Sequence, residues 1–217
     1  MTGYIAGIMS GSGNEMNIGV LGGTFDPIHK GHLAVAEETR NRLSLAEVLF
    51  VPAGQPQLKE NRPIASAEHR VKMVRLSIAD KPYFKLSTLE VERTGPSYTV
   101  DTMAELKGKL GDGDEPFFIL GVGSLVELPR WKEPSRLIQI CWLVGVPRPG
   151  YPASDLNALE TVIPGLSQRV ILLDAPLIAI SSSDIRDRVA HGLSISHLVP
   201  KPVERVIKEN TLYARQT

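Results

Sequence analysis

The sequence GGTFDPIHKGH, residues 22–32, begins where the short apolar run Asn17–Leu21 ends. The apolar run predicts a buried strand, and the residues after the turn predict a helix over His32–Leu43. Gly22 and Gly23 let the chain turn sharply and let its backbone come close to a ligand. A strand that leads through such a turn into a helix presents backbone N–H groups and the positive end of the helix dipole. We therefore expect residues 22–32 to bind an anion such as a phosphate.

Two histidines lie near the end of this segment. His29 and His32 are three positions apart, with Gly31 between them. At this spacing both imidazoles can reach one phosphate from the same side, and the Thr24 hydroxyl can donate another hydrogen bond. Asp26 is expected to cap the turn. No third ligand follows at a spacing that suits zinc, so a metal site is not predicted. The segment matches neither the dinucleotide-binding glycine pattern nor the P-loop, which disfavours dehydrogenases and P-loop hydrolases.

Short apolar strands alternate with amphipathic helices along the rest of the chain. This alternation is typical of an α/β fold in which helices cover both faces of a doubly wound, mostly parallel sheet. Ligands of such sheets bind at the carboxyl ends of the strands, near a switch point in strand order. The expected strands are 17–21, 48–51, 84–91, 117–120, 141–146 and 169–173, and the expected helices are 32–43, 66 onward, 99–110, 134–140, 156–163, 182–190 and a last one after 200.

The overall composition limits the function classes. Lysine and arginine number 24, and aspartate and glutamate also number 24, so a basic excess typical of nucleic-acid binding is missing. The single cysteine, Cys141, excludes an intramolecular disulfide, and its apolar neighbours predict a buried, inert thiol. No apolar stretch approaches the ~20 residues of a membrane span. We expect a disordered tail over residues 1–16, a single domain over residues 17–217 and a cytoplasmic protein, and the sequence leaves a homodimer open.

A second stretch, ISSSDIR at residues 180–186, also suits phosphates. Serine hydroxyls open a helix here, and Arg186 follows one turn later. The alternative is an ordinary serine cap with a surface arginine. Because the first motif already suits a phosphate, we favour Ser181, Ser183 and Arg186 as a site for the outer phosphates of a triphosphate.

Residues 22–32 closely resemble the signature of the nucleotidyltransferases that carry an H-x-G-H pair, and most of all that of bacterial nicotinate-nucleotide adenylyltransferases. Residues 180–186 resemble the C-terminal motif of the same superfamily. The resemblance covers the chain from Asn17 onward and implies a Rossmann-like fold. It also implies transfer of the adenylyl group of ATP to nicotinate mononucleotide, giving deamido-NAD and pyrophosphate in NAD biosynthesis, with Mg²⁺ accompanying ATP.

The resemblance assigns a role to each matching residue. Catalytic roles fall to His29, His32 and Arg186. Residues expected to bind ATP are Gly22, Gly23, Thr24, Phe25, His29, Gly31, His32, Ser181, Ser183 and Arg186. Residues expected to bind the acceptor are Lys59, Ser97, Tyr98, Thr99 and Trp131, the last by packing near the nicotinate ring.

The sequence departs from the family pattern in two places. Residues 57–59 read Gln-Leu-Lys where the family usually carries Pro-His-Lys, and Gly123 stands where the family usually has an aspartate after the central strand. The second departure keeps two alternatives open. The acceptor could be nicotinamide mononucleotide or another phosphate compound, or the chain could be a nucleotide-binding protein with impaired turnover.

Overall fold

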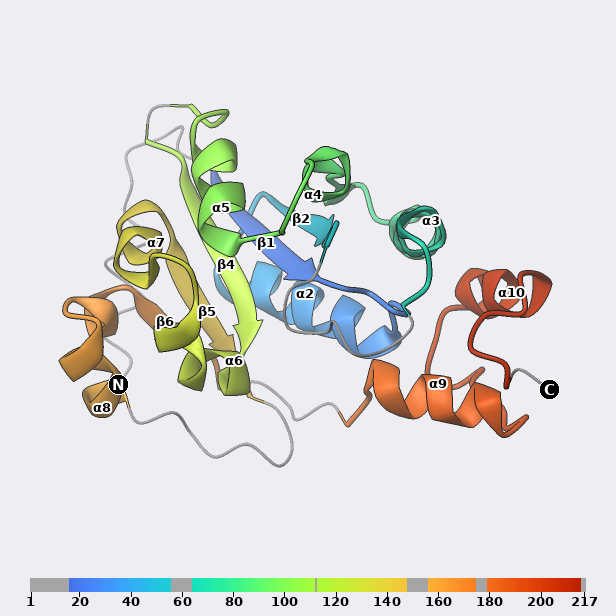
Figure 1. The fold of residues 1–217 in the computed structure, drawn as a ribbon. Helices are drawn as coiled ribbons and strands as arrows, with labels where there is room; N and C mark the ends of the chain where they lie inside the picture. The colour runs from blue at the N-terminus through green and yellow to red at the C-terminus, as the bar shows by residue number, and fades with distance from the viewer. Residues whose placement is uncertain (1–15, 56–63, 112, 148–155, 175–178, 216–217) are drawn as a thin grey trace.

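The computed structural model describes residues 16–55, 64–111, 113–147, 156–174 and 179–215 (Figure 1). Its centre is a six-stranded sheet in the order β3-β2-β1-β4-β5-β6, and every neighbouring pair is parallel. This confirms the predicted doubly wound parallel sheet. Apart from Met16, the predicted tail lies outside the described residues. The strands are β1 (Asn17–Gly23), β2 (Glu47–Pro52), β3 (Phe84–Leu86), β4 (Glu115–Gly121), β5 (Trp142–Val146) and β6 (Val170–Leu172).

The order of the strands reverses between β1 and β4. β1 pairs with β2 on one side and with β4 on the other, so the chain runs outward from β1 in both directions. In sheets of this kind the loops at the carboxyl ends of the two central strands diverge and leave room for a ligand. Residues 22–32 leave the sheet at this point.

Helices cover both faces of the sheet (Figure 1). They are α2 (Lys30–Arg42), α3 (Ala67–Ile78), α4 (Leu89–Glu92), α5 (Thr99–Lys107), α6 (Val122–Val126), α7 (Pro134–Ile140), α8 (Leu156–Val162), α9 (Ser182–Ala190) and α10 (Lys201–Glu209), with 3-10 turns at Leu128–Arg130 and Leu166–Gln168. None of the helices in the described ranges is both long and apolar enough to cross a membrane.

Two hydrophobic clusters lie on opposite faces of the sheet. Leu21 belongs to the first cluster and its neighbour Val20 to the second, and Phe117 and Phe118 divide in the same way. Successive strand residues point to opposite faces, so one buried strand supplies both clusters. Side chains of α2, α3, α9 and α10 complete the first cluster, and those of α5, α7 and α8 complete the second.

The structure corrects one predicted strand and adds two helices. The strand predicted over 84–91 ends at Leu86, and α4 follows it over Leu89–Glu92. In α4, Glu90 is buried and accepts a hydrogen bond from Thr102 on α5. The sequence also gave no sign of α6, which begins directly after β4 and spans only Val122–Val126.

Candidate active site

His29 and His32 form a reciprocal pair at the start of α2. The Nδ1 atom of His29 accepts the backbone N–H of His32 at 3.3 Å, and the Nδ1 atom of His32 accepts the backbone N–H of His29 at 3.2 Å. The two rings stack with their centroids 3.7 Å apart and their planes at 24°. In a neutral imidazole whose Nδ1 accepts, the proton is on Nε2. The pairing therefore sets both Nε2 atoms as donors.

The backbone at this helix start differs from the expectation. The N–H group of Lys30 donates to the carbonyl of Leu198 at 2.9 Å, and that of His32 is held by His29. The predicted row of unpaired N–H groups is therefore partly used inside the protein. The imidazoles at the start of α2 are therefore better candidates than its first backbone N–H groups for donating hydrogen bonds to an anion.

The turn before the histidines is tightly packed. Phe25 is buried and has a φ of 50°. Its ring packs edge-on with the His32 ring, and the two ring centroids are 5.1 Å apart. A Cβ atom on Gly22 would lie 3.1 Å from the Phe118 ring, which explains a glycine at this point. Gly23 ends β1, and Gly31 is buried in the first turn of α2. The packing behind His32 restricts the position of its ring.

Asp26 links distant parts of the chain. Its carboxylate, 1% exposed, accepts the N–H of Ala65 at 3.1 Å and the hydroxyl of Tyr213 at 2.8 Å. The sequence predicted only a local cap of the turn. The observed contacts instead connect residues 22–32 to the residues before α3 and to the segment that follows α10.

Arg70 joins the loops that follow β1 and β2. Its Nη1 atom donates to the carbonyls of Thr24 at 2.9 Å and Ala53 at 2.7 Å, and its Nε atom donates to Ala65 at 3.0 Å. The side chain is buried, and this burial lowers the pKa of Arg70 while nearby Asp26 opposes the shift. Sequence reasoning missed this residue because its partners are backbone carbonyls of distant segments.

The second motif lies directly against the first. Ser182 Oγ donates to the carbonyl of Pro27 at 2.9 Å, and Arg186 Nη1 donates to the carbonyl of Asp26 at 2.7 Å. Arg186 Nη2 also donates to Ser183 Oγ at 3.0 Å, while Ser181 caps α9 by accepting the N–H of Asp184. The Arg186 side chain is 16% exposed, which argues against the alternative of a surface arginine. The two motifs therefore contact each other, through Ser182 and Arg186 on one side and the carbonyls of Pro27 and Asp26 on the other.

Ser97 supports a loop. Its Oγ atom accepts the N–H groups of Gly54 at 3.0 Å and Gln55 at 3.2 Å, and its hydroxyl donates to the carboxylate of Glu90. Glu90 is buried, and burial raises the pKa of this carboxyl group. A Cβ atom on Gly54 would lie 2.0 Å from the Glu90 carbonyl oxygen, so the loop after β2 packs closely on α4. The structure thus occupies a hydroxyl that was expected to bind the acceptor.

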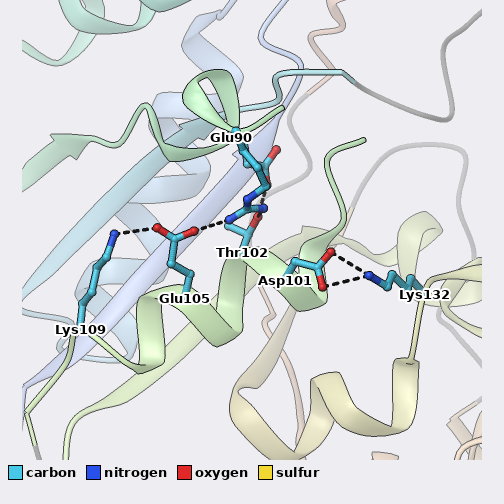
Figure 2. Close-up of polar contacts among 7 residues, drawn as sticks. Glu90, Asp101, Thr102, Glu105, Lys109 and Lys132 are labelled. Atoms are coloured by element: carbon cyan, nitrogen blue, oxygen red, sulfur yellow. Dashed lines mark hydrogen bonds and ion pairs between the residues drawn. The ribbon is translucent and has the colours of Figure 1, made fainter. Parts of the chain in front are cut away.

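A polar network continues from Glu90 along α5. Thr102 donates to Glu90 at 2.7 Å and accepts from Arg93 at 3.1 Å, and Glu105 pairs with both Arg93 and Lys109 (Figure 2). The network fixes α5 against α4 just beyond the segment 97–99. It was not anticipated from the sequence.

The remaining acceptor residues gather near the start of α5. Tyr98 and Trp131 both pack against the second cluster, and Lys132 lies 4.9 Å above the Tyr98 ring while pairing with Asp101 (Figure 2). Thr99 is the first residue of α5. Among the described residues, no hydrogen-bond partner reaches the buried Nε1 atom of Trp131. Lys59 lies outside the described residues.

Gly123, the departure from the family pattern, lies in the first turn of α6 at the carboxyl end of β4. Because β4 pairs with β1 in parallel, Gly123 lies at the same edge of the sheet as the end of β1. Across the described ranges, no three side chains of histidine, cysteine, aspartate and glutamate gather in a way that could hold a metal ion.

Known proteins resemble the chain in sequence and fold. A family described as cytidylyltransferase-like matches residues 20–188. A protein of Dehalococcoides mccartyi strain CBDB1, named "Probable nicotinate-nucleotide adenylyltransferase", is 48% identical over 202 residues, which cover 93% of this chain and 99% of that protein. A Roseiflexus protein of the same name is 46% identical and covers 90% of this chain and 97% of its own length. The Plasmodium falciparum nicotinic acid mononucleotide adenylyltransferase complexed with NaAD shares the fold, with a TM-score of 0.75, 20% identity and coverage of 92% of this chain and 98% of that chain.

Proposed function

The chain belongs to the cytidylyltransferase-like family, and we propose that it is a nicotinate-nucleotide adenylyltransferase of NAD biosynthesis. Such an enzyme transfers the adenylyl group of ATP to nicotinate mononucleotide and releases pyrophosphate. The observation that carries the proposal is the direct contact between the two phosphate motifs, in which Arg186 donates to the carbonyl of Asp26 within the signature segment. Relatives that bear this name match nearly the whole chain.

The proposed reaction is an in-line displacement at phosphorus. A phosphate oxygen of nicotinate mononucleotide attacks the α-phosphorus of ATP, a new P–O bond forms, and the bond to pyrophosphate breaks. The nucleophile is already an anion near neutral pH, so no general base is needed. The protein's task is to hold two negatively charged molecules in line and to stabilise the charge that develops on the phosphates.

Side chains of both motifs supply this stabilisation. The Nε2–H groups of His29 and His32 donate to the triphosphate, and Arg186 with Ser181 and Ser183 binds the phosphates that leave. ATP is expected to enter as its Mg²⁺ complex, in which phosphate oxygens of the nucleotide would ligate the ion. The backbone of Gly22, Gly23, Thr24, Phe25 and Gly31 shapes the turn around the nucleotide.

The acceptor binds near the start of α5 in this proposal. Tyr98, Thr99 and Trp131 are assigned to the pyridine ring, and Lys59, which lies outside the described residues, is assigned to the acceptor by the family resemblance alone. Trp131 offers a flat ring for stacking. Ser97 contributes by holding Gly54 and Gln55 in place. We further propose that residues 17–217 form one domain and that the enzyme works in the cytoplasm, where ATP is available.

Pyrophosphate release tests the proposal. The purified chain is supplied with MgATP and either nicotinate mononucleotide or nicotinamide mononucleotide, and pyrophosphate is measured over time. Faster release with the nicotinate form is expected. Faster release with the amide form would change the assigned acceptor. Binding of both substrates without release would favour the nucleotide-binding alternative that Gly123 raises, and Gly123→Asp is then the variant to assay.

A further inference from the structure

We propose that Tyr213 is a positioning residue for Arg186, acting through the carboxylate of Asp26. The inference rests on the proposed function, because Arg186 is there assigned to the leaving phosphates. Tyr213 lies beyond α10 and is 187 positions away from Asp26 in the sequence. It therefore ties the end of the described chain to the signature segment.

The first step of the argument is the contact between Tyr213 and Asp26. The hydroxyl donates to Oδ1 at 2.8 Å, and the same oxygen accepts the N–H of Ala65 at 3.1 Å. Because Asp26 is buried, neither donor competes with bulk water for this oxygen. Two donors on one oxygen fix the rotation of the carboxylate group.

The second step runs from Asp26 to Arg186. The Nη1 atom of Arg186 donates to the Asp26 carbonyl at 2.7 Å and lies 3.7 Å from Oδ2. A carboxylate that is held at Oδ1 by Tyr213 thus presents its other oxygen to the guanidinium. If the Tyr213 hydroxyl is removed, Oδ1 keeps the Ala65 N–H donor but loses the Tyr213 donor, and the second carboxylate oxygen is held less firmly beside the guanidinium.

The third step is the way in which Tyr213 itself is held. Burial and the neighbouring Asp26 carboxylate raise the pKa of the Tyr213 hydroxyl, so it stays a neutral donor over the physiological range. Tyr213 and Thr211 both adopt left-handed backbone conformations, with φ of 65° and 50°, which non-glycine residues seldom do. His69 Nε2 and Asn210 Oδ1 lie 3.2 Å apart, which joins the start of α3 to the end of α10 just before this segment.

The test compares two tyrosine variants. Tyr213→Phe removes the hydroxyl on Asp26. Tyr83→Phe is the matched control, because its hydroxyl also donates to a carboxylate at 2.8 Å, that of Glu37, yet it contacts neither motif. For Tyr213→Phe we expect the KM for ATP to rise roughly fivefold, the size of effect that follows from losing one hydrogen bond of typical net strength. The KM for nicotinate mononucleotide and both constants of Tyr83→Phe are expected to stay unchanged.

A spectroscopic measurement keeps the inference separate from the proposed activity. The side-chain Nε–H resonance of Arg186 is identified as the signal that Arg186→Lys loses, and it is recorded without substrates. Tyr213→Phe is expected to shift and broaden it, and Tyr83→Phe to leave it in place. An unchanged Arg186 signal in Tyr213→Phe would overturn the inference, as would equal KM changes in the two tyrosine variants. A wild-type chain that releases no pyrophosphate would contradict the proposed function, and the Arg186 signal would still decide the role of Tyr213.

Discussion

The Nδ1 atom of His29 accepts the backbone N–H of His32, and the Nδ1 atom of His32 accepts the backbone N–H of His29. One pair of side chains therefore caps α2 and sets the direction of two ring donors. Helix stability and the proposed catalysis thus depend on the same two residues, and substitutions can separate them.

His29→Asn is expected to separate the two roles. Asparagine is a good helix cap, so the variant should retain the cap but lose the Nε2–H donor, and turnover should fall by ~10²–10³. His29→Ala should lose the same turnover and be about 1 kcal/mol less stable than His29→Asn. Steady-state kinetics and urea unfolding check the pair. Near-normal turnover in His29→Asn would count against a role for the imidazole in catalysis.

Arg186→Ala is expected to raise the ATP requirement more than the acceptor requirement. The guanidinium lies beside the signature segment, where it is assigned to the phosphates that leave. Loss of a charge-assisted donor should raise the KM for ATP about tenfold or more. Arg188→Ala on the same helix is the control, since Arg188 donates to the carbonyl of Ser194 instead. Equal effects of the two variants would contradict the assignment.

Arg70→Met should destabilise the fold. The substitution leaves the carbonyls of Thr24, Ala53 and Ala65 without their donor, and an unpaired buried group costs about 1–3 kcal/mol. We expect the free energy of unfolding to fall by about 3 kcal/mol or more. Arg75→Met, on the exposed side of the same helix, should change it by less than about 0.5 kcal/mol. A small effect in Arg70→Met would show that water replaces these contacts.

Glu90 should make stability depend on pH. Burial raises the pKa of this carboxyl group above its ordinary value of 4.5, so the folded protein binds its proton more tightly than the unfolded chain. Its contribution is most favourable below pH 4.5 and is lost as the pH rises through the raised pKa. Glu90→Gln removes this dependence, so its stability relative to wild type should improve between pH 4 and pH 8. Urea unfolding at both pH values measures this, with the exposed Glu92→Gln as control. A pH-independent difference would contradict the burial effect.

Cys141 should resist alkylation in the folded protein. Burial raises the pKa of its thiol to about 12, so very little thiolate exists at pH 8. Iodoacetamide should label the native chain roughly a thousandfold more slowly than the chain in urea. Mass spectrometry over time follows the labelling. Comparable rates in the two states would show that the thiol is accessible.

Much of the fold could be predicted because its signals are local. The apolar runs and the helical periodicity between them predict a parallel sheet, and Cys141 was correctly expected to be buried, although it caps α7 and the strand begins at Trp142. α6 has five residues, which is too short for a periodic pattern. α4 follows β3 where more strand was predicted, and it carries the hydrogen bond from Thr102 to Glu90, a contact between separate segments that no local pattern reveals.

Part of the candidate site could also be predicted from the sequence, and part of it could not. The residues of both phosphate motifs were named from sequence, since each motif is short and contiguous. The two motifs contact each other through Ser182 and Arg186, whose partners lie 155 and 160 positions away in the sequence. Only the structure reveals these contacts. Ser97 was assigned to the acceptor, but its hydroxyl is used on Gly54, Gln55 and Glu90. Arg70 and Tyr213 were not predicted, because each contacts residues that are distant in the sequence and such contacts produce no local sequence motif.

α9 and Tyr213 contact residues 22–32, and these contacts between distant segments have a consequence for the synthesis of the protein. The histidines are synthesised well before the residues that contact their segment, because those residues follow 155 to 187 positions later in the sequence. A nascent chain that has passed only β6 holds the first motif without the second. The candidate site can therefore assemble only after α9 and Tyr213 have been synthesised, and a chain that stops after β6 would lack every contact that these later residues make with Asp26 and Pro27.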